Sequence, residues 1–356
     1  MAFEVACCIS SHDSLTFHYL TPLARHPLVS KLWIVRPRES AYGAIPKAEY
    51  VLTPARAKPV RFLQMYRACR QLARRTEVRA FVSFNPVPYG LIALFASRGS
   101  GTPIHLGFIG SDWYTHSVGP LGRWFMPRYR KASFITATGV GMRRAMMDRG
   151  LDGDRIAVLP HCVDPDEYPV SDPANAKHTF VFVGELNRRK RVDLILHAFA
   201  DVAKRHPAAR LCIVGDGAEG GKLRALAQDL GIAESVTFTG FVRNVYSHLA
   251  DARVVVVASE QEGFPFALVE GMCAGLVPVS TPVGTIPDLI EDGRNGLLCP
   301  RGDATALAAC MMRLLEEDGL YDRIRPNVLA MREQFSFDAA TAVWDRWLRE
   351  LSESGG

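Results

Sequence analysis

Two glutamates, Glu262 and Glu270, stand at the ends of the run EGFPFALVE, which is otherwise uncharged. An apolar strand precedes this run and apolar residues resume at Phe266, so the pattern predicts a strand, a loop and a helix. Pro265 suits the first helical position, where a missing N–H is no loss, and Gly275 suits the position just beyond the helix. Glu262 would then lie in the loop and Glu270 near the second turn, at most about 12 Å apart.

These two carboxylates predict a site for an activated sugar. The free N–H groups at a helix N-terminus attract anions, and carboxylates accept hydrogen bonds from vicinal hydroxyls. A carboxylate, an anion site and a second carboxylate match the hexose, the diphosphate and the ribose of a sugar nucleotide. An ordinary helix with two solvated glutamates is the alternative.

A second stretch, FVGELNRRKRVDLILHAF at 182–199, supplies positive charge. An apolar strand ends at Gly184, and four consecutive cations, residues 188–191, precede a helix. Glycine permits close backbone approach, and cations at a strand–helix junction suit a diphosphate. A solvated basic turn is the alternative. The stretch IVGDGAEGGKL, 213–223, resembles GxGxxG only loosely, so a dinucleotide-dependent dehydrogenase is disfavoured.

Apolar runs alternate with amphipathic helices throughout the chain. Uninterrupted apolar strands in such a series predict parallel sheets covered on both faces. The sequence therefore predicts an α/β protein of two doubly wound, Rossmann-like domains that face a central cleft. The expected strands are residues 3–10, 31–36, 79–84, 103–110, 133–138 and 155–160 in the first domain, and 179–184, 210–215, 235–240, 253–259 and 276–280 in the second.

A stretch with three prolines and no periodicity, 161–178, marks the domain boundary. We expect an N-terminal acceptor-binding domain at 1–164, a linker at 165–177 and a nucleotide-sugar-binding domain at 178–335. The last segment, 336–356, is expected to be a helix that packs back towards the first domain.

Composition bounds the class of protein. Among the 356 residues, 48% are hydrophobic and 22% charged, which are ordinary globular values. Eight cysteines without a CxxC pair predict buried, reduced thiols and not a disulfide frame or a zinc site. The N-terminus reads as a strand and not as a signal peptide. The expected location is cytoplasmic, in solution or peripheral on the inner leaflet of the plasma membrane.

Charge is distributed unevenly between the two halves. Residues 1–164 carry 22 Lys and Arg against 10 Asp and Glu, a net charge of +12, whereas the remainder has a net charge of −7. Cations dominate residues 56–79, and aromatic side chains interleave with cations at 122–134. This pattern predicts contact with an anionic membrane; solvated helix faces are the alternative. Nucleic acid is disfavoured, because no recognition module accompanies the charge.

The run EGFPFALVE resembles the E-x7-E motif of family-4 retaining glycosyltransferases of the GT-B fold. The stretches VGELNRRKRVDLILHAF, CIVGDGAEGGKLRALAQDLGI and VPVSTPVGTIPDLIEDGRNGLL follow the order and spacing of that family. The resemblance extends from about residue 155 to 315, and the first domain matches mainly in its alternation of strands and helices.

The resemblance implies transfer of a sugar, with retention and without a metal, from a UDP-, GDP- or ADP-linked donor to a hydroxyl acceptor. The acceptor would be a glycan or a lipid-linked precursor in cell-surface polysaccharide or glycolipid synthesis, and no cofactor is implied beyond the donor itself. Glu262 would bind the donor sugar and Glu270 the ribose, while Lys190 would neutralise the leaving diphosphate. The implied donor-binding residues are Glu270, Arg189, Arg188, Gly184, Gly263, Phe264, Pro265, Phe266, Ala267, Leu268, Phe241 and Val242.

The chain departs from the family in three places. Glu185 stands where Arg is common, SSHDS at 10–14 replaces a Gly-Gly loop, and Ile109 replaces a histidine. Asp112 is nevertheless a catalytic candidate beside Glu262 and Lys190. The acceptor-side candidates are Ser11, His12 and His116. The departures leave two rivals open: an epimerase or hydrolase of sugar nucleotides on the same fold, and a non-catalytic sugar-nucleotide-binding protein.

Overall fold

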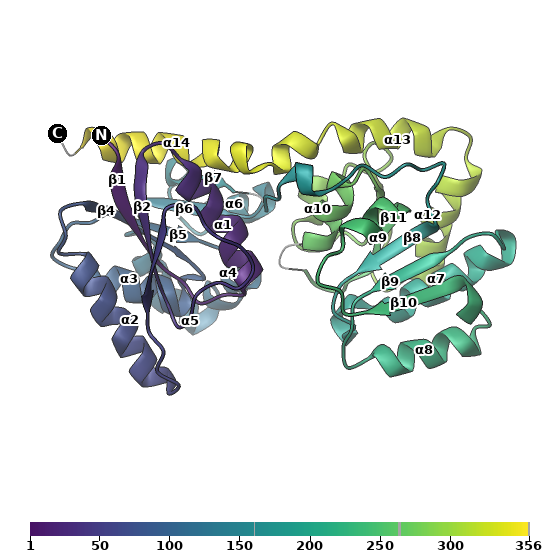
Figure 1. The fold of residues 1–356 in the computed structure, drawn as a ribbon, viewed down its shortest axis with the longest axis horizontal. Coiled ribbons are helices and arrows are strands. Elements are labelled where there is room, and N and C mark those ends of the chain that lie inside the picture. Colours follow the sequence, from purple (N-terminus) through teal and green to yellow (C-terminus); the bar gives the residue numbers. More distant parts are fainter. Residues whose placement is uncertain (160, 263–264, 355–356) are drawn as a thin grey trace. The chain divides into compact units, whose positions relative to one another are not determined.

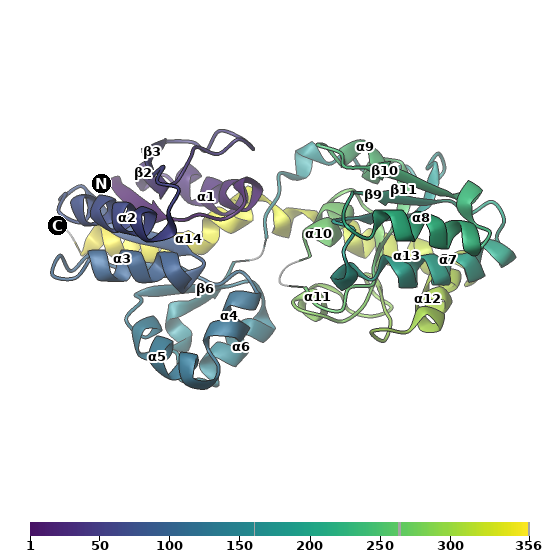
Figure 2. The ribbon, with the colours of Figure 1, turned by 90° about the horizontal axis from the view of Figure 1, so that it is seen from below.

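The computed structural model describes residues 1–159, 161–262 and 265–354, and the chain divides into two compact units. One unit comprises Met1–Cys162 and Phe337–Gly356, and the other Val163–Ser336. Each unit is a twisted sheet covered by helices (Figures 1 and 2). The segment 165–177 falls within the second unit and contains a short 3₁₀ turn, Pro165–Glu167.

The first unit contains, within the described residues, a seven-stranded parallel sheet in the order β3-β2-β1-β4-β5-β6-β7. Its strands are β1 Phe3–Cys8, β2 Val29–Arg36, β3 Ala48–Leu52, β4 Val78–Phe84, β5 Ile104–Gly107, β6 Phe134–Ala137 and β7 Ile156–Val158. Its helices are α1 Asp13–Arg25, α2 Lys58–Leu72, α3 Leu91–Ala96, α4 Ser111–His116, α5 Gly119–Tyr129, α6 Val140–Met147 and α14 Phe337–Glu353. The strand β3 was not expected, because AEYVL lies at the sheet edge and is only half-buried.

Apolar residues on both faces of the central strands hold the helices of the first unit in place. In β1, Val5 and Ala6 point to opposite faces and are both fully buried. One face packs against α2, α3, α5 and α6, and the other against α1 and α14. The last helix therefore belongs to the first unit, where Trp344 and Trp347 lie in the core.

The second unit contains, in the part of the chain that is described, a six-stranded parallel sheet in the order β10-β9-β8-β11-β12-β13. Its strands are β8 His178–Val183, β9 Leu211–Val214, β10 Val236–Gly240, β11 Ala252–Val257, β12 Val277–Ser280 and β13 Leu297–Leu298. Its helices are α7 Val192–Arg205, α8 Gly220–Asp229, α9 Tyr246–Ala250, α10 Phe266–Cys273, α11 Ile286–Leu289, α12 Ala304–Glu316 and α13 Leu320–Leu329. The apolar stripe of α7 faces the core, as its spacing of three and four residues predicts.

The strand order of the second sheet determines where a ligand can bind. From β8 the chain winds outwards through β9 and β10, then returns to β11 on the other side of β8 and continues to β12. In open parallel sheets, ligands bind at the carboxyl ends of the strands where this reversal occurs. Here the reversal lies between β8 and β11, so the loops after Val183 and Val257 meet there. These are the two loops that carry the cations and Glu262.

Two further findings bear on the expectations from composition. All eight cysteines lie within the described residues, and all are buried with free thiols. Among the helices of the described residues, none combines the length and the hydropathy needed to cross a bilayer.

Buried neutral histidines make the first unit sensitive to acid. Burial lowers the pKa of His105 from 6.5 to about 3 and that of His18 to about 4. His105 contacts Thr136 at 2.9 Å and packs edge-on against Trp344. Between the folded and unfolded pKa values only the unfolded chain binds the proton, so stability is expected to fall as the pH falls below about 6.5. Each histidine contributes at most about 1.4 kcal/mol per pH unit.

Denaturant titrations between about pH 7.5 and 5 measure this slope. We expect the slope to be shallower in His105→Gln than in the unmodified protein, and unchanged in the control His12→Gln, because His12 is exposed. An equal slope in all three proteins would contradict the assignment.

Candidate active site

The centre of the candidate site is an ion pair between the loops that follow β8 and β11. Lys190 Nζ lies 2.7 Å from Glu262 Oε1, and the Ser259 hydroxyl donates to the same oxygen at 2.6 Å. The side chains of Lys190 and Glu262 are only 20% and 8% exposed. A largely buried pair of opposite charges therefore lies where the sheet topology places a ligand.

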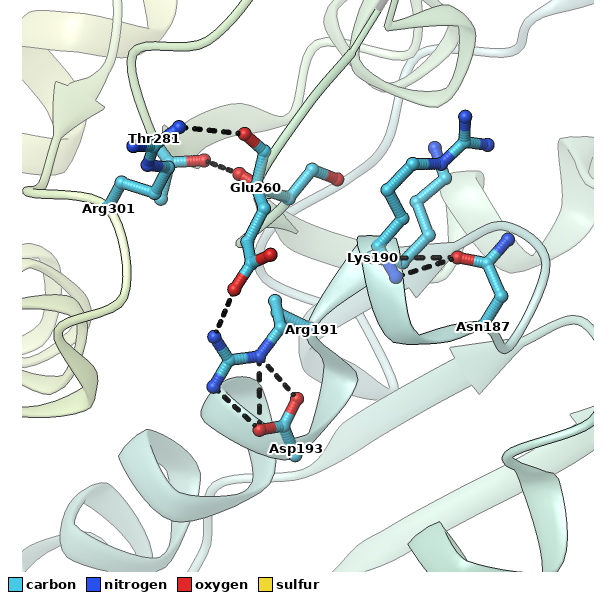
Figure 3. A network of polar contacts seen from close by, with 9 residues as sticks. Asn187, Lys190, Arg191, Asp193, Glu260, Thr281 and Arg301 are labelled. Atoms are coloured by element: carbon cyan, nitrogen blue, oxygen red, sulfur yellow. Dashed lines mark hydrogen bonds and ion pairs between the residues drawn. The ribbon is translucent and has the colours of Figure 1, made fainter.

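The position of Lys190 is determined by the turn that carries it. Asn187 caps this turn, because its side-chain oxygen accepts hydrogen bonds from the backbone N–H groups of Arg189 at 3.1 Å and Lys190 at 3.3 Å. The turn itself is the 3₁₀ segment Arg188–Lys190. Figure 3 shows Asn187 beside the backbone of Lys190. The sequence analysis did not single out Asn187, although an Asn before a helical turn is a common capping signal.

Of the four cations in this turn, Arg191 is engaged elsewhere. Its guanidinium contacts Asp193 at 2.9 Å and Glu260 at 2.6 Å (Figure 3). Hydrogen bonding to Asp193, opposed by burial and assisted by Glu260, raises the pKa of Arg191. The Glu260 N–H also donates to the Arg189 carbonyl at 2.9 Å. Arg191 thus joins the two loops and is not available to a diphosphate.

The side chains of Arg188 and Arg189 are exposed, in agreement with a role towards a ligand or solvent. Arg188 lies at the limit of an ion pair with Glu219, at 4.0 Å. Within the described residues, the Arg189 side chain makes no hydrogen bond or ion pair. Lys190 therefore has a fixed side-chain position, whereas the side chains of Arg188 and Arg189 are exposed and can change position when a ligand binds.

The segments that follow β12 and β13 hold the backbone around Glu262 in place. The Thr281 hydroxyl donates to the Ser259 carbonyl at 2.8 Å, and Arg301 donates to the Glu260 carbonyl at 3.2 Å (Figure 3). Gly284 has a φ of +59°, and a Cβ atom there would lie 2.4 Å from the Glu262 carbonyl oxygen. The glycine in TPVGTIPDLI is therefore required for the close approach of two backbones.

Gly284→Ala is expected to displace the Glu262 loop. An alanine at positive φ costs about 1–2 kcal/mol, and this strain arises both at Gly284 and at the control position Gly293. Only at Gly284 does the added methyl group also meet a backbone atom. Gly293 is the matched control, because its φ is +76° and its Cβ position is open. Both variants should lose thermal stability, Gly284→Ala more than Gly293→Ala because of the added clash, and only Gly284→Ala should also lose calorimetric affinity for UDP. Equal affinities would show that this contact does not position the loop.

The helix α10 carries the second glutamate of the motif. Pro265 occupies the N-cap and Phe266 the first helical position, so the expectation for Pro265 was wrong by one residue. The reason is its ψ of 76°, which is not helical. Gly275 has a φ of +75° and takes the position after the C-cap, as expected. The helix ends in a Schellman motif, with Leu276 N–H donating to Gly271 O at 2.9 Å.

Glu270 lies on α10 as expected, in its second turn. Its carboxylate accepts a hydrogen bond from the Tyr168 hydroxyl at 3.1 Å. Burial raises the pKa of Glu270, and the bond from Tyr168 opposes that rise. Tyr168 was missed by sequence reasoning, because it lies 102 residues away in a stretch without periodicity.

The remaining donor-side candidates flank these two loops. Ala267 and Leu268 lie in the first turn of α10, and Gly184 directly follows β8. Phe241 is 79% exposed just after β10, and Val242 packs partly against the core. Gly263 and Phe264 lie outside the described residues.

In the first unit, Asp112 lies in the first turn of α4, beyond the carboxyl end of β5. Its carboxylate accepts hydrogen bonds from the backbone N–H groups of Ile109 at 3.2 Å and Trp113 at 2.9 Å. Burial raises the pKa of Asp112 to about 6, against the effect of these bonds. The Asp112 carboxylate thus holds its own loop through these hydrogen bonds, and its pKa is about 6.

Of the other first-unit candidates, His116 shares α4 with Asp112, and its charge opposes the rise in the pKa of that carboxyl. Ser11 shares a hydrogen bond with Thr16 at 3.0 Å. His12 is exposed at the N-cap of α1, and the ring of His116 packs edge-on against Phe125. In the SSHDS loop the sequence analysis missed Asp13, which forms an ion pair at 2.7 Å with the buried Arg36 and also accepts from the Ala41 N–H.

Comparisons with known proteins show what this chain is similar to. Residues 165–330 match the family described as glycosyl transferases group 1. The chain is 33% identical to N-acetyl-alpha-D-glucosaminyl L-malate synthase of Bacillus anthracis, over 50% of this chain and 46% of that protein. It is 31% identical to D-inositol 3-phosphate glycosyltransferase of Acidothermus cellulolyticus, over 57% and 50%. The chain thus spans about half the length of these relatives, and the matched segment contains both glutamates and Lys190.

Solved structures show the same fold over nearly the whole chain. Anabaena Alr3699/HepE, crystallised with UDP and glucose, is similar with a TM-score of 0.78 and 19% identity, covering 98% of this chain and 100% of that one. The lipopolysaccharide outer core galactosyltransferase WaaB is similar with a TM-score of 0.74 and 17% identity, covering 98% and 99%. Two Rossmann-like units of the GT-B type are therefore confirmed as the fold of this protein.

Proposed function

We propose that the protein is a glycosyltransferase that moves a sugar from a nucleotide-diphosphate donor to a hydroxyl acceptor. The observation that carries this proposal is the Lys190–Glu262 ion pair at the switch point of the second sheet, inside the segment that matches glycosyl transferases group 1. The UDP complexes of HepE, a protein of the same fold, support a nucleotide-sugar donor. The relatives in colanic acid and amylovoran biosynthesis support a cell-surface glycan or a lipid-linked precursor as the acceptor.

Exchange of partners at the ion pair gives each residue its role. A donor diphosphate takes Lys190 from Glu262, with Arg189 as a second cation. Glu262 is then free to accept hydrogen bonds from hydroxyls of the donor sugar. The positive charge of Lys190 stabilises the negative charge that develops on the departing diphosphate.

The helix α10 orients the rest of the donor. The N–H groups of its first turn, near Phe266, attract the phosphates. Glu270 binds the ribose hydroxyls, and Tyr168 holds the carboxylate in place through the contact at 3.1 Å. The exposed ring of Phe241 offers a face on which the base can stack.

Retention of configuration and independence of a metal form the finer part of this proposal. The eight-residue spacing of Glu262 and Glu270 supports assignment to family 4. In such a reaction the leaving diphosphate accepts the proton of the acceptor hydroxyl as the new glycosidic bond forms, and cationic side chains take the place of a metal. Asp112, with its pKa near neutrality, is the candidate for contact with acceptor or donor sugar in the first unit.

The first unit is also proposed to contact an anionic bilayer on the cytoplasmic side. Most of the exposed large apolar side chains are in this unit, among them Val60 and Leu63 on α2 and Leu121 and Trp124 on α5. They accompany the net charge of +12 of residues 1–164, and cations interleaved with exposed apolar groups suit an anionic interface. Equal sedimentation with neutral and anionic liposomes at low salt would contradict this contact.

The proposal is tested by following the sugar of UDP-, GDP- and ADP-linked donors with and without acceptor. Thermal-shift screening first selects the donor. Product that forms only in the presence of acceptor, with the anomeric configuration of the donor sugar, is the expected result. Release or epimerisation of the sugar without acceptor would indicate the hydrolase or epimerase rival. Binding without turnover on any acceptor extract would indicate a binding protein.

A further inference from the structure

A basic pocket lies in the first unit at the amino-terminal edge of its sheet. Its volume is about 640 Å³, and it forms where β4 and β5 begin and where α2 and α14 end. The pocket is lined by Arg70, Ala73, Arg74, Arg75, Thr76, Val78, Arg79, Gly99, Ser100, Gly101, Thr102, Pro103, Leu351 and Ser354. The ligand sites of parallel sheets lie at the opposite, carboxyl edge, so this pocket belongs to neither the donor loops nor the Asp112 loop.

The lining of the pocket is positive. Four arginines line it, and the lining contains no carboxylate among the described residues. Arg79 donates to the carbonyl of Leu351 at 3.2 Å. Arg70 donates to two backbone carbonyls, Ala96 O at 2.9 Å and Arg98 O at 2.5 Å. These carbonyl groups fix the direction of the Arg70 guanidinium but leave its charge in place.

The other two arginines differ in their partners. Arg75 pairs with two carboxylates, at 3.5 Å to Glu4 and 3.9 Å to Glu77. Arg74 is exposed and, in the part of the chain that the structure describes, makes no side-chain hydrogen bond or ion pair. The charges of Arg70 and Arg74 therefore face one space without a carboxylate in its lining, and an anion that enters reduces their repulsion.

The remaining lining groups suit an oxyanion. Ser100 and Thr102 add hydroxyl groups. In this structure Ser100 donates to the Ser97 carbonyl at 2.7 Å and lies 2.8 Å from the Thr102 hydroxyl, so Thr102 is the hydroxyl that can turn its proton to an anion. Gly99 and Gly101 have φ values of +81° and +71°, and no atom lies near the Cβ positions, so the loop leaves the pocket open. Guanidinium forks held by backbone carbonyls match the geometry of phosphate oxygens.

We propose that this pocket binds the phosphate group of an anionic ligand, at a second site separate from the donor loops. Two sources share this chemistry: a soluble phosphate compound and the headgroup of an anionic phospholipid. A ligand at this edge would not compete with a nucleotide, because the groups that bind the two lie at opposite edges of their sheets and in different units.

The first experiment uses inorganic pyrophosphate and the full chain. The variants carry Lys190→Ala, so that the donor loops contribute little to the binding measured by calorimetry. In this background, adding Arg74→Ala should weaken pyrophosphate binding at least about threefold, since charge-assisted contacts are strong. Within residues 1–159, 161–262 and 265–354 the Arg74 side chain has no hydrogen-bond or ion-pair partner, so the melting temperature should hold. Arg67→Ala, exposed on α2 shortly before the turn that carries Arg74 and outside the lining, is the matched control and should bind as before.

The second experiment uses vesicles of phosphatidylcholine alone and of phosphatidylcholine mixed with phosphatidylglycerol. If the ligand is a lipid headgroup, Arg74→Ala should reduce sedimentation with the mixed vesicles more than Arg67→Ala does. If it is a soluble phosphate compound, only the calorimetric arm should separate the two variants. Equal losses in both variants in both arms, or no binding of either probe, would overturn the proposal. Neither result depends on whether sugar transfer occurs.

Discussion

Glu262→Gln is expected to lose most sugar transfer, at least about a hundredfold in kcat/KM, while UDP affinity is retained or increases. The two effects have one cause. In the proposed mechanism the carboxylate accepts charge-assisted hydrogen bonds from the donor sugar, each typically worth about 1.5–3 kcal/mol. The same carboxylate competes with the diphosphate for Lys190, which it holds at 2.7 Å. Removal of the negative charge therefore weakens the sugar contact and releases the cation.

Steady-state kinetics and UDP calorimetry on the same preparation check this expectation. Glu291→Gln is the matched control, because Glu291 is exposed and pairs only with Arg294 on the surface. Unchanged transfer in Glu262→Gln would remove the central residue from the proposed mechanism. A parallel loss of transfer and UDP affinity would show instead that the variant loop no longer holds its position.

Lys190→Ala is expected to weaken binding of nucleoside diphosphates by about 1.5–3 kcal/mol, which corresponds to about ten- to a hundredfold. Lys190 is the cation of its turn that pairs with Glu262, and Glu262 retains its hydrogen bond from Ser259 when the lysine is removed. The fold should therefore persist. Because the pair is partly buried, the loss should depend less on salt than the loss of a surface cation would.

Calorimetry with UDP, GDP and ADP at low and high salt measures this loss. Lys204→Ala is the control, because Lys204 is exposed on α7 and pairs with Asp201 within its own helix. If Lys190→Ala binds the preferred diphosphate as tightly as Lys204→Ala does, the phosphate assignment is wrong, whatever the effect on transfer.

Local patterns determined the elements of this protein and the element on which each candidate lies. Continuous apolar runs gave the buried strands, because both faces of a parallel sheet exclude water. The spacing of apolar residues gave the inward face of α7, and Gly275 marked the end of α10. The half-exposed edge strand β3 and the two-residue β13 lack such runs and were missed.

The partners of the site residues were decided by tertiary structure alone. Lys190 meets Glu262 across 72 positions of the chain because β8 lies beside β11, and strand order is not encoded in either local run. Tyr168 and Glu270, and Gly284 and the Glu262 backbone, are brought together in the same way. Sequence could place two carboxylates and a group of cations on neighbouring loops. Only the packed sheet determines which cation faces the carboxylate and which one joins the loops, because that choice depends on contacts between residues far apart in the chain.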